Sequence, residues 1–109
     1  MTDIVLVLTT VPAPDVGEQI ARARVDARLA ACVNVLPPMV SIYRWQGAVH
    51  RDTEHQVVIK TTRARLTALR ERLDALHPYD LPECIVVPVE GGDPAYLAWV
   101  AGETADPVE

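Results

Sequence analysis

Three short runs of this sequence are apolar at every position, and they constrain the fold more than any other feature does. The runs are Ile4–Leu8, Val57–Ile59 and Ile85–Val87. Successive side chains of a strand point to opposite faces of its sheet, so a strand with one solvated face alternates apolar and polar residues. These runs therefore predict strands with apolar groups on both faces. Helices of the same chain would cover one face, and the other face needs a further cover.

Prolines and glycines bound the predicted strands. We predict strands over residues 3–10, 32–36, 40–46, 48–61 and 85–89. Residues 32–46, interrupted at Pro37–Pro38, form either two strands or one bent long strand. Gly47 supplies the turn of a hairpin with the segment that ends in Val57–Ile59.

Apolar residues at helical spacing predict three helices. The first covers about Asp15–Ala30 and opens on a capping-box pattern completed by Glu18. The second lies within Thr62–Pro78, where Thr62 serves as a cap and the leucines step by three, four and three. The third covers Ala95–Ala101, with Asp93–Pro94 as its cap and first-turn proline.

The predicted order is βαββαβ followed by a terminal helix, in a single domain over residues 1–109. Right-handed crossovers place the two main helices on the same face of an antiparallel sheet, which is the α+β arrangement of a ferredoxin-like sandwich. The open apolar face indicates association, and the simplest partner is another copy of the chain. The alternative is that the third helix or an acidic, frayed tail over Glu103–Glu109 covers this face.

Charge and the early apolar run exclude several classes of partner. The chain has 10 basic and 15 acidic residues, a formal charge of −5, and a single lysine, Lys60, so we expect no nucleic-acid partner. Ile4–Leu8 is far too short to span a bilayer and follows no basic region, so we expect no signal peptide and no membrane partner. Cys32 and Cys84 are too few for a disulfide framework, and we expect a cytoplasmic protein.

We find no catalytic signature and expect no enzymatic activity. An acyl-phosphate hydrolase of this fold needs a cationic loop with free N–H groups, whereas the first loop, Thr10–Pro14, has two prolines and no basic residue. The same loop lacks the two cysteines of a Cu(I) chaperone. A sheet that stacks RNA bases would need aromatic residues on strands that have none here.

Aromatic residues are scarce, yet two of them share one side of a predicted strand. Tyr43 and Trp45 lie two positions apart in SIYRWQG, and they face a core, another subunit or a ligand. Lys60 is either solvated at its strand end or paired with a small anionic ligand. Tyr79 either covers the core as a loop residue or lines a pocket.

A bound divalent metal, Cu or Zn, is the one cofactor that the residues suggest. Cys32, His77 and Glu83 are chemically capable ligands. His77 and Glu83 flank a stiff, proline-containing segment and would lie on the rim of a pocket; the alternative is that His77 binds carbonyl groups at the helix end. His50 and His55 would lie on opposite strand faces and would not chelate a metal together.

Five stretches, in order along nearly the whole chain, resemble the CutA divalent-cation tolerance proteins. The matching stretches are Leu29–Val35, Ser41–Gly47, Lys60–Thr62, His77–Glu83 and Gly92–Trp99. The resemblance implies a ferredoxin-like subunit in a tight homotrimer similar to the PII signalling proteins, with sheets packed inward and long hairpins that reach neighbouring subunits. It also implies a part in tolerance of copper and other divalent metals, and no enzymatic activity.

The resemblance also implies a copper site of one Cys and two successive His in enterobacterial members. Thr9 and Leu76 occupy two of these positions, and only His77 matches. Our interpretation is therefore a non-enzymatic CutA-type trimer with weak metal binding at clefts between subunits, in which Tyr43 and Trp45 lie first of all at a subunit contact. The alternatives are a PII-like sensor that binds a small anionic metabolite in such clefts through Lys60 and the aromatic pair, and an interaction scaffold.

Overall fold

The structure of the chain, a computed structural model, describes residues 2–105, except for the side chains of Asp74 and Leu76. The described residues form four strands, three α-helices and one 3-10 turn. In chain order these elements are β1 (Ile4–Val11), α1 (Pro14–Asp26), β2 (Cys32–Trp45), β3 (Ala48–Thr62), η1 (Arg63–Arg65), α2 (Leu66–Leu76), β4 (Ile85–Pro88) and α3 (Pro94–Glu103).

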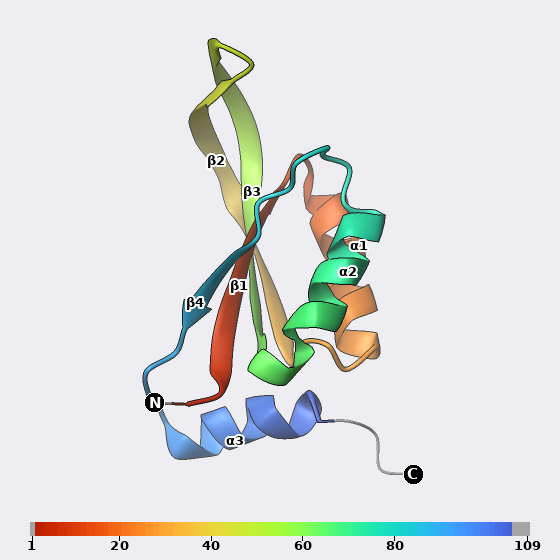
Figure 1. Cartoon of the computed structure of the whole chain (residues 1–109), viewed down its shortest axis with the longest axis vertical. Coiled ribbons are helices and arrows are strands. Elements are labelled where there is room, and N and C mark those ends of the chain that lie inside the picture. The colour runs from red at the N-terminus through yellow and green to blue at the C-terminus, as the bar shows by residue number, and fades with distance from the viewer. Residues whose placement is uncertain (1, 106–109) are drawn as a thin grey trace.

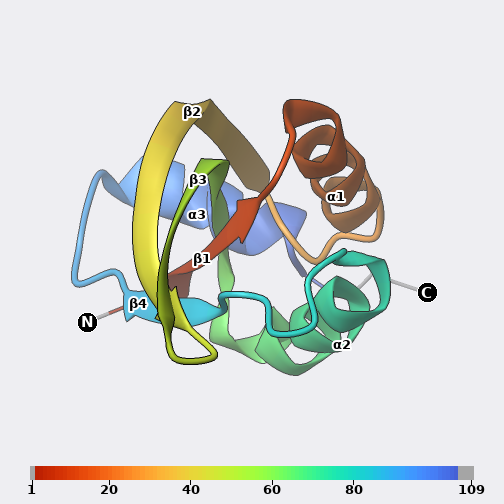
Figure 2. The ribbon, with the colours of Figure 1, turned by 90° about the horizontal axis from the view of Figure 1, so that it is seen from above.

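The strands form one antiparallel sheet in the order β2-β3-β1-β4. Helices α1 and α2 lie side by side on one face of this sheet, and the β2–β3 hairpin extends well beyond them (Figures 1 and 2). This arrangement confirms the predicted α+β, ferredoxin-like architecture. The third helix, α3, lies across the end of the sheet near the N-terminus (Figure 1).

The β2 segment is one bent long strand, which is one of the two alternatives predicted from the sequence. Its pairing with β3 shifts register between Val35 and Pro38. The shift falls at the two prolines, which lack the N–H group that a regular ladder needs. The pairing continues beyond it to Trp45 and Ala48 at the tip of the hairpin.

The predicted limits and caps of two helices are wrong. Helix α1 ends at Asp26 instead of Ala30, because Arg28 takes the left-handed conformation, with φ 60°. Its N-cap is Ala13, without a side-chain hydrogen bond, so Asp15 does not open the helix. Thr62 caps the 3-10 turn through its backbone only, and its hydroxyl lies 3.5 Å from that of Thr104.

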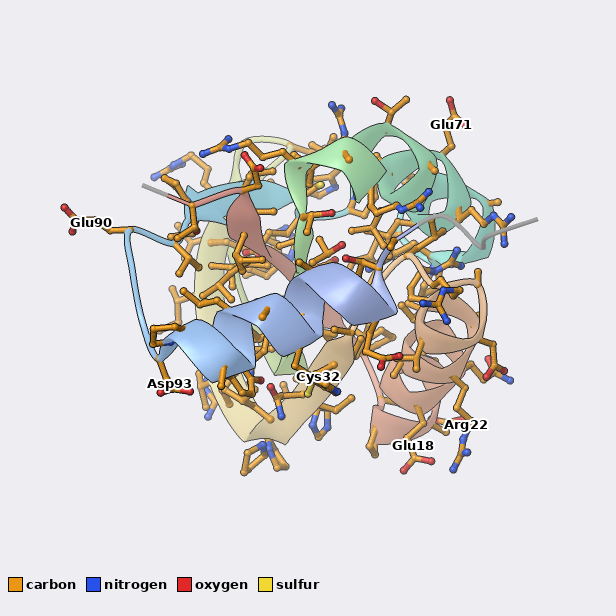
Figure 3. The ribbon with its side chains drawn as sticks, turned by 90° about the horizontal axis from the view of Figure 1, so that it is seen from below. Glu18, Arg22, Cys32, Glu71, Glu90 and Asp93 are labelled. Carbon is orange, nitrogen blue, oxygen red and sulfur yellow. The ribbon has the colours of Figure 1, made fainter. Side chains whose placement is uncertain are left out.

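The third helix is capped as predicted but is longer. The Asp93 carboxylate accepts a hydrogen bond from the Tyr96 N–H (3.0 Å), and Pro94 is the first helical residue. Figure 3 shows α3 from below, with Asp93 at its first turn. The helix includes Glu103, so the predicted tail starts too early; residues 106–109 of that prediction lie outside the described part of the chain.

The apolar runs of β1 and β3 do present side chains to both faces. Val5, Val7, Val57 and Ile59 are fully buried on the helix side of the sheet, where they pack in one cluster with Ile20, Leu69 and Leu73. The alternate residues Leu6 and Leu8 point to the opposite face and are only half-buried. The alternate residues of these runs thus contribute to the core on one face of the sheet and to a second apolar surface on the other face.

The second face is covered only at one end. Helix α3 packs there through Val100 against Ile4 and Ala31. Farther along the same face, Ile85 is 50% exposed and Val87 37% exposed. The alternative in which α3 covers the whole face therefore holds only in part, and among residues 2–105 an apolar strip remains open.

Gly17 lets α1 approach the sheet closely. A Cβ atom at this position would lie 3.0 Å and 3.1 Å from the two Cγ atoms of Val35 and 3.3 Å from Cγ2 of Val11. These distances are shorter than an ordinary van der Waals contact. The position of α1 on β1 and β2 therefore depends on the absence of a side chain at residue 17.

We expect Gly17→Ala to destabilise the protein, because the new Cβ must displace the stiff Val35 side chain. Overpacking of this kind costs about 1–3 kcal/mol, which exceeds the gain of up to about 1 kcal/mol from the better helix propensity of alanine. Gly102→Ala is the matched control, because in α3 nothing lies within 4 Å of its added Cβ. Denaturant unfolding should show a lower midpoint for Gly17→Ala only; equal midpoints for the two variants would contradict this packing.

Candidate functional site

A cleft of about 880 Å³ lies between the outer half of the β2–β3 hairpin and the segment that links α2 to β4. Its lining residues are Thr10, Pro12, Met39, Ser41, Tyr43, Trp45, Asp52, Thr53, Glu54 and residues 78–83. The volume falls within the range of about 300–1,000 Å³ typical of small-molecule sites. This cleft is the candidate functional site.

Strand alternation explains why these side chains meet. Met39, Ser41, Tyr43 and Trp45 are two apart on β2 and share one face. Across the hairpin, Ser41 pairs with Asp52 and Met39 with Glu54, which places both carboxylates on that same face. The turn at Gly47, with φ 79°, fixes this register.

Two tyrosines bind the two carboxylates of β3. The Tyr43 hydroxyl donates to Asp52, and the Tyr79 hydroxyl donates to Glu54 at 2.8 Å. The bond to Asp52, together with partial burial, raises the pKa of Tyr43. Burial and the bond to Glu54 raise the pKa of Tyr79 well above its ordinary range. Both phenols therefore remain neutral donors at physiological pH.

His77 is buried and uses both of its ring nitrogens. Its Nε2 lies 2.7 Å from the Thr10 carbonyl, and its Nδ1 accepts the Tyr79 N–H at 3.1 Å. A carbonyl only accepts and an amide N–H only donates, so His77 is the neutral tautomer with its proton on Nε2. The ring thereby ties the start of the 78–83 segment to β1, instead of binding the helix-end carbonyls.

Glu83 holds the other end of the 78–83 segment against β1 and β3. Gln56 donates to Glu83 at 2.9 Å and to the Thr9 carbonyl at 2.7 Å through the same amide nitrogen. His77 and Glu83 thus both lie near the cleft, but in different roles: one ring is fully bonded within the fold, and one carboxylate lines the hollow.

Lys60 and Cys32 lie away from the cleft. They face each other across β2 and β3, and the Lys60 ammonium contacts the Tyr96 hydroxyl at 3.3 Å and lies 5.7 Å from the centre of its ring. Lys60 is six residues from Glu54 along β3, which corresponds to about 20 Å. The structure therefore brings Tyr43, Trp45, Tyr79 and Glu83 together and separates Lys60 from them.

The three predicted metal ligands do not converge within one subunit. Among residues 2–105, no group of three or more His, Cys, Asp or Glu side chains is placed to hold a metal ion. Cys32 is half-buried beside Lys60, and His77 has no lone pair left for a metal. His50 and His55 are also apart: His50 contacts the Trp45 carbonyl and His55 the Leu36 carbonyl.

Asp52 and Glu54 are the site residues that sequence reasoning missed. Their signal was present, because a two-residue turn at Gln46–Gly47 places residues 52 and 54 opposite 41 and 39. Counting back along the hairpin would have put an acidic pair beside the aromatic pair. No helix within residues 2–105 is both long and apolar enough to cross a bilayer.

The whole domain is similar to a known family. Residues 5–103 match the model of the CutA1 divalent ion tolerance protein. A divalent-cation tolerance protein CutA of Thermus thermophilus is 48% identical over 99 residues, which cover 91% of this chain and 96% of the relative. A chloroplastic CutA of Arabidopsis thaliana is 41% identical over 100 residues; the match covers 92% of this chain but 55%, about half, of the relative.

Solved structures agree with the sequence matches. The divalent cation tolerance protein of Thermus thermophilus superposes with a TM-score of 0.91 at 46% identity, covering 94% of this chain and 99% of that one. CutA of Xylella fastidiosa superposes with a TM-score of 0.92 at 46% identity, covering 95% and 100%. Thus the fold and most of the length are shared.

The raised pKa of Tyr79 predicts a late step in alkaline titration. An unfolded tyrosine ionises near pH 10, whereas folded Tyr79 keeps its proton to higher pH. The stability gained from this proton is therefore complete below about pH 10 and is lost as the pH rises toward the folded pKa. Phenolate absorbance should show a late component that Tyr79→Phe removes.

Glu54→Gln tests the cause of this shift. It removes the negative charge next to the phenol but leaves the burial, so the late component should move to lower pH without reaching the value of an unfolded tyrosine. A titration curve that Glu54→Gln leaves unchanged would show that the Tyr79–Glu54 bond does not form in solution.

Proposed function

Because this chain belongs to the CutA1 divalent ion tolerance family, we propose that it takes part in the tolerance of divalent cations as a non-enzymatic homotrimer whose cleft binds cations weakly. Its relatives are named as tolerance proteins and not as enzymes. One observation carries the cation part of the proposal: all charged side chains that line the cleft are carboxylates.

The sign of the charge decides which ligands the cleft favours. Asp52, Glu54, Asp80 and Glu83 line it, and no Lys, Arg or His is among its described lining residues. Carboxylates gathered around one cleft create a negative potential that attracts cations and repels anions. The electrostatics therefore support copper or another divalent cation as a weakly held ligand.

The anionic-metabolite alternative lacks this support. It groups Lys60 with Tyr43 and Trp45 in a cleft between subunits, whereas within one subunit Lys60 contacts Tyr96 at the other end of the sheet. An anion next to Tyr43 would meet Asp52 at once. Within one subunit, the charges of the cleft therefore favour a cation over an anion.

Metal binding in the cleft is expected to be weak. Asp52, Glu54 and Glu83 each accept a hydrogen bond within the fold, and a metal ion would have to compete with these donors. Zn²⁺ usually has four protein or water ligands, and Cu²⁺ prefers nitrogen donors that this hollow does not supply.

We place the role in the cytoplasm, because Cys32 and Cys84 are free thiols, the state that a reducing compartment maintains.

The exposed apolar groups support the trimer. Ile85 and Val87 leave the outer face of the sheet open, and the hairpin carries Ile42, 70% exposed, together with Val40 and Val49. The β2–β3 hairpin projects well beyond α1 and α2, where it is accessible to a neighbouring subunit (Figure 1). Burial of such apolar surface in an interface favours association of subunits.

Calorimetric titration with Zn²⁺ and Cu²⁺ tests cation binding. We expect weak binding that Glu83→Gln reduces about five- to tenfold, which corresponds to the loss of about 1 kcal/mol of electrostatic attraction. Cys32→Ser is the matched control, since Cys32 lies outside the cleft. Tight binding that Cys32→Ser abolishes and Glu83→Gln does not would contradict a role for the cleft.

Light scattering tests the assembly. We expect the wild type to have the mass of a trimer and Val87→Lys to shift it toward the monomer, because a lysine would place a charge in the apolar contact. Glu90→Lys, an exposed position in the loop before α3, is the control and should keep the trimer mass. A monomeric wild type would refute the proposed assembly.

A further inference from the structure

The cleft has the composition of a receptor for an organic ammonium ion. We propose that it binds a small organic cation, an ammonium group on an apolar body, in preference to a bare metal ion. This inference rests on the proposed cation preference and adds the chemical class of the ligand. It comes from one juxtaposition: the rings of Tyr43, Trp45 and Tyr79 line the same hollow as Asp52 and Glu54.

The aromatic rings offer surface to a ligand. Tyr43 and Trp45 are each 40% exposed although both line the hollow. Tyr43 is held in place by stacking on His50, with ring centroids 5.5 Å apart and planes 20° apart. Tyr79 is fixed against the His77 ring at 4.8 Å. Rigid aromatic faces attract cations through the negative side of the ring, and quaternary ammonium groups are recognised in this way.

The tyrosine–carboxylate bonds strengthen this attraction. A phenol that donates its proton toward a carboxylate gains electron density in the ring, and both Tyr43 and Tyr79 do so. Each carboxylate keeps further lone pairs, since an ionised carboxylate has about four acceptor positions. One N–H group of an ammonium ion can therefore bind Asp52 or Glu54 while the rest of the cation lies on a ring.

A bare metal ion fits the same hollow poorly. It needs several ligands at once, but within residues 2–105 no three carboxylate, thiol or imidazole groups converge on one point. An ammonium ion needs a single carboxylate, and ring faces supply the rest of its surroundings. The few carboxylate ligands that make metal binding weak are thus sufficient, together with the aromatic rings, to bind an organic cation.

The size and rim of the cleft point to an apolar body on that cation. A volume of about 880 Å³ is far larger than a metal ion requires. Met39 and Pro82 contribute apolar lining, and Leu81 at the rim is 71% exposed. A ligand with an aromatic or alkyl body would cover these groups and gain from their burial.

The proposal can be tested with benzylammonium and benzyl alcohol, which differ mainly in the charged group. The chain has two tryptophans, so Trp99→Phe leaves Trp45 in the cleft as the only tryptophan reporter. We expect a saturable change in Trp45 fluorescence with benzylammonium, and at least about tenfold weaker binding of benzyl alcohol. In the wild type, the indole N–H signal of Trp45 should shift in NMR spectra while that of Trp99 does not. This second measurement tests the proposal even if Trp99→Phe does not fold.

Two variants assign the binding to the cleft. Glu54→Gln and Tyr79→Phe should each weaken benzylammonium binding about threefold or more, whereas Tyr96→Phe, on α3, should not change it. Equal affinity for benzyl alcohol, binding that persists in both cleft variants, or no saturable signal with benzylammonium by fluorescence and NMR would each overturn the proposal.

Parallel titrations with Zn²⁺ and inorganic phosphate distinguish binding of a metal ion, an organic cation and an anion. Zn²⁺ binding that depends on Glu83, without benzylammonium binding, would leave the proposed function standing and reject the organic ligand. Binding of neither cation would reject both. Phosphate binding that is lost in Lys60→Met would instead restore the anionic alternative.

Discussion

The antiparallel pairing of β1 with β3 is the interaction on which the rest of the structure depends. It joins Ile4–Val11 to His55–Thr62 residue by residue, and the apolar runs Ile4–Leu8 and Val57–Ile59 present side chains to both faces of the sheet. The inner side chains hold α1 and α2, whereas the outer ones leave a surface that α3 covers only at its end. A shift of one residue would exchange the two sets, so the pairing also fixes which side chains face the cleft.

Much of the fold follows from local sequence patterns, and the exceptions have physical reasons. Runs of apolar residues and proline breaks predict the strands, and the leucine spacing predicts α2, because these signals are contained within each segment. The end of α1 was missed because Arg28 adopts a conformation with positive φ that usually favours glycine or asparagine. Its side chain is bonded to the Ala105 and Gly102 carbonyls, a contact more than 70 residues away that no local pattern shows.

The aromatic side of the candidate site was predictable from the sequence, but its acidic pair and the roles of several residues were not. Tyr43, Trp45, Tyr79 and Glu83 were all singled out, and they do share the cleft. His77 was chosen for its chemistry, yet its ring is bonded to a carbonyl of β1 that lies 67 residues earlier. Lys60 was grouped with the aromatic pair in the alternative of an anion-binding sensor, whereas the register places Tyr43 opposite His50, ten residues before Lys60 on β3. Residue type thus indicates which contacts a side chain can make, while the strand register determines which residues it contacts.

The carbonyl groups at the end of α3 are bound by arginines from two other parts of the chain. Arg28 follows α1, and Arg65 in η1 donates to the Thr104 carbonyl, while the Thr104 hydroxyl binds the Val100 carbonyl. A terminal helix usually opens first, through local fluctuations that need little free energy. Here such an opening would break charge-assisted contacts to elements that carry the central sheet. We therefore expect the last turn of α3 to open less readily than a helix end whose carbonyl groups are bound only by water.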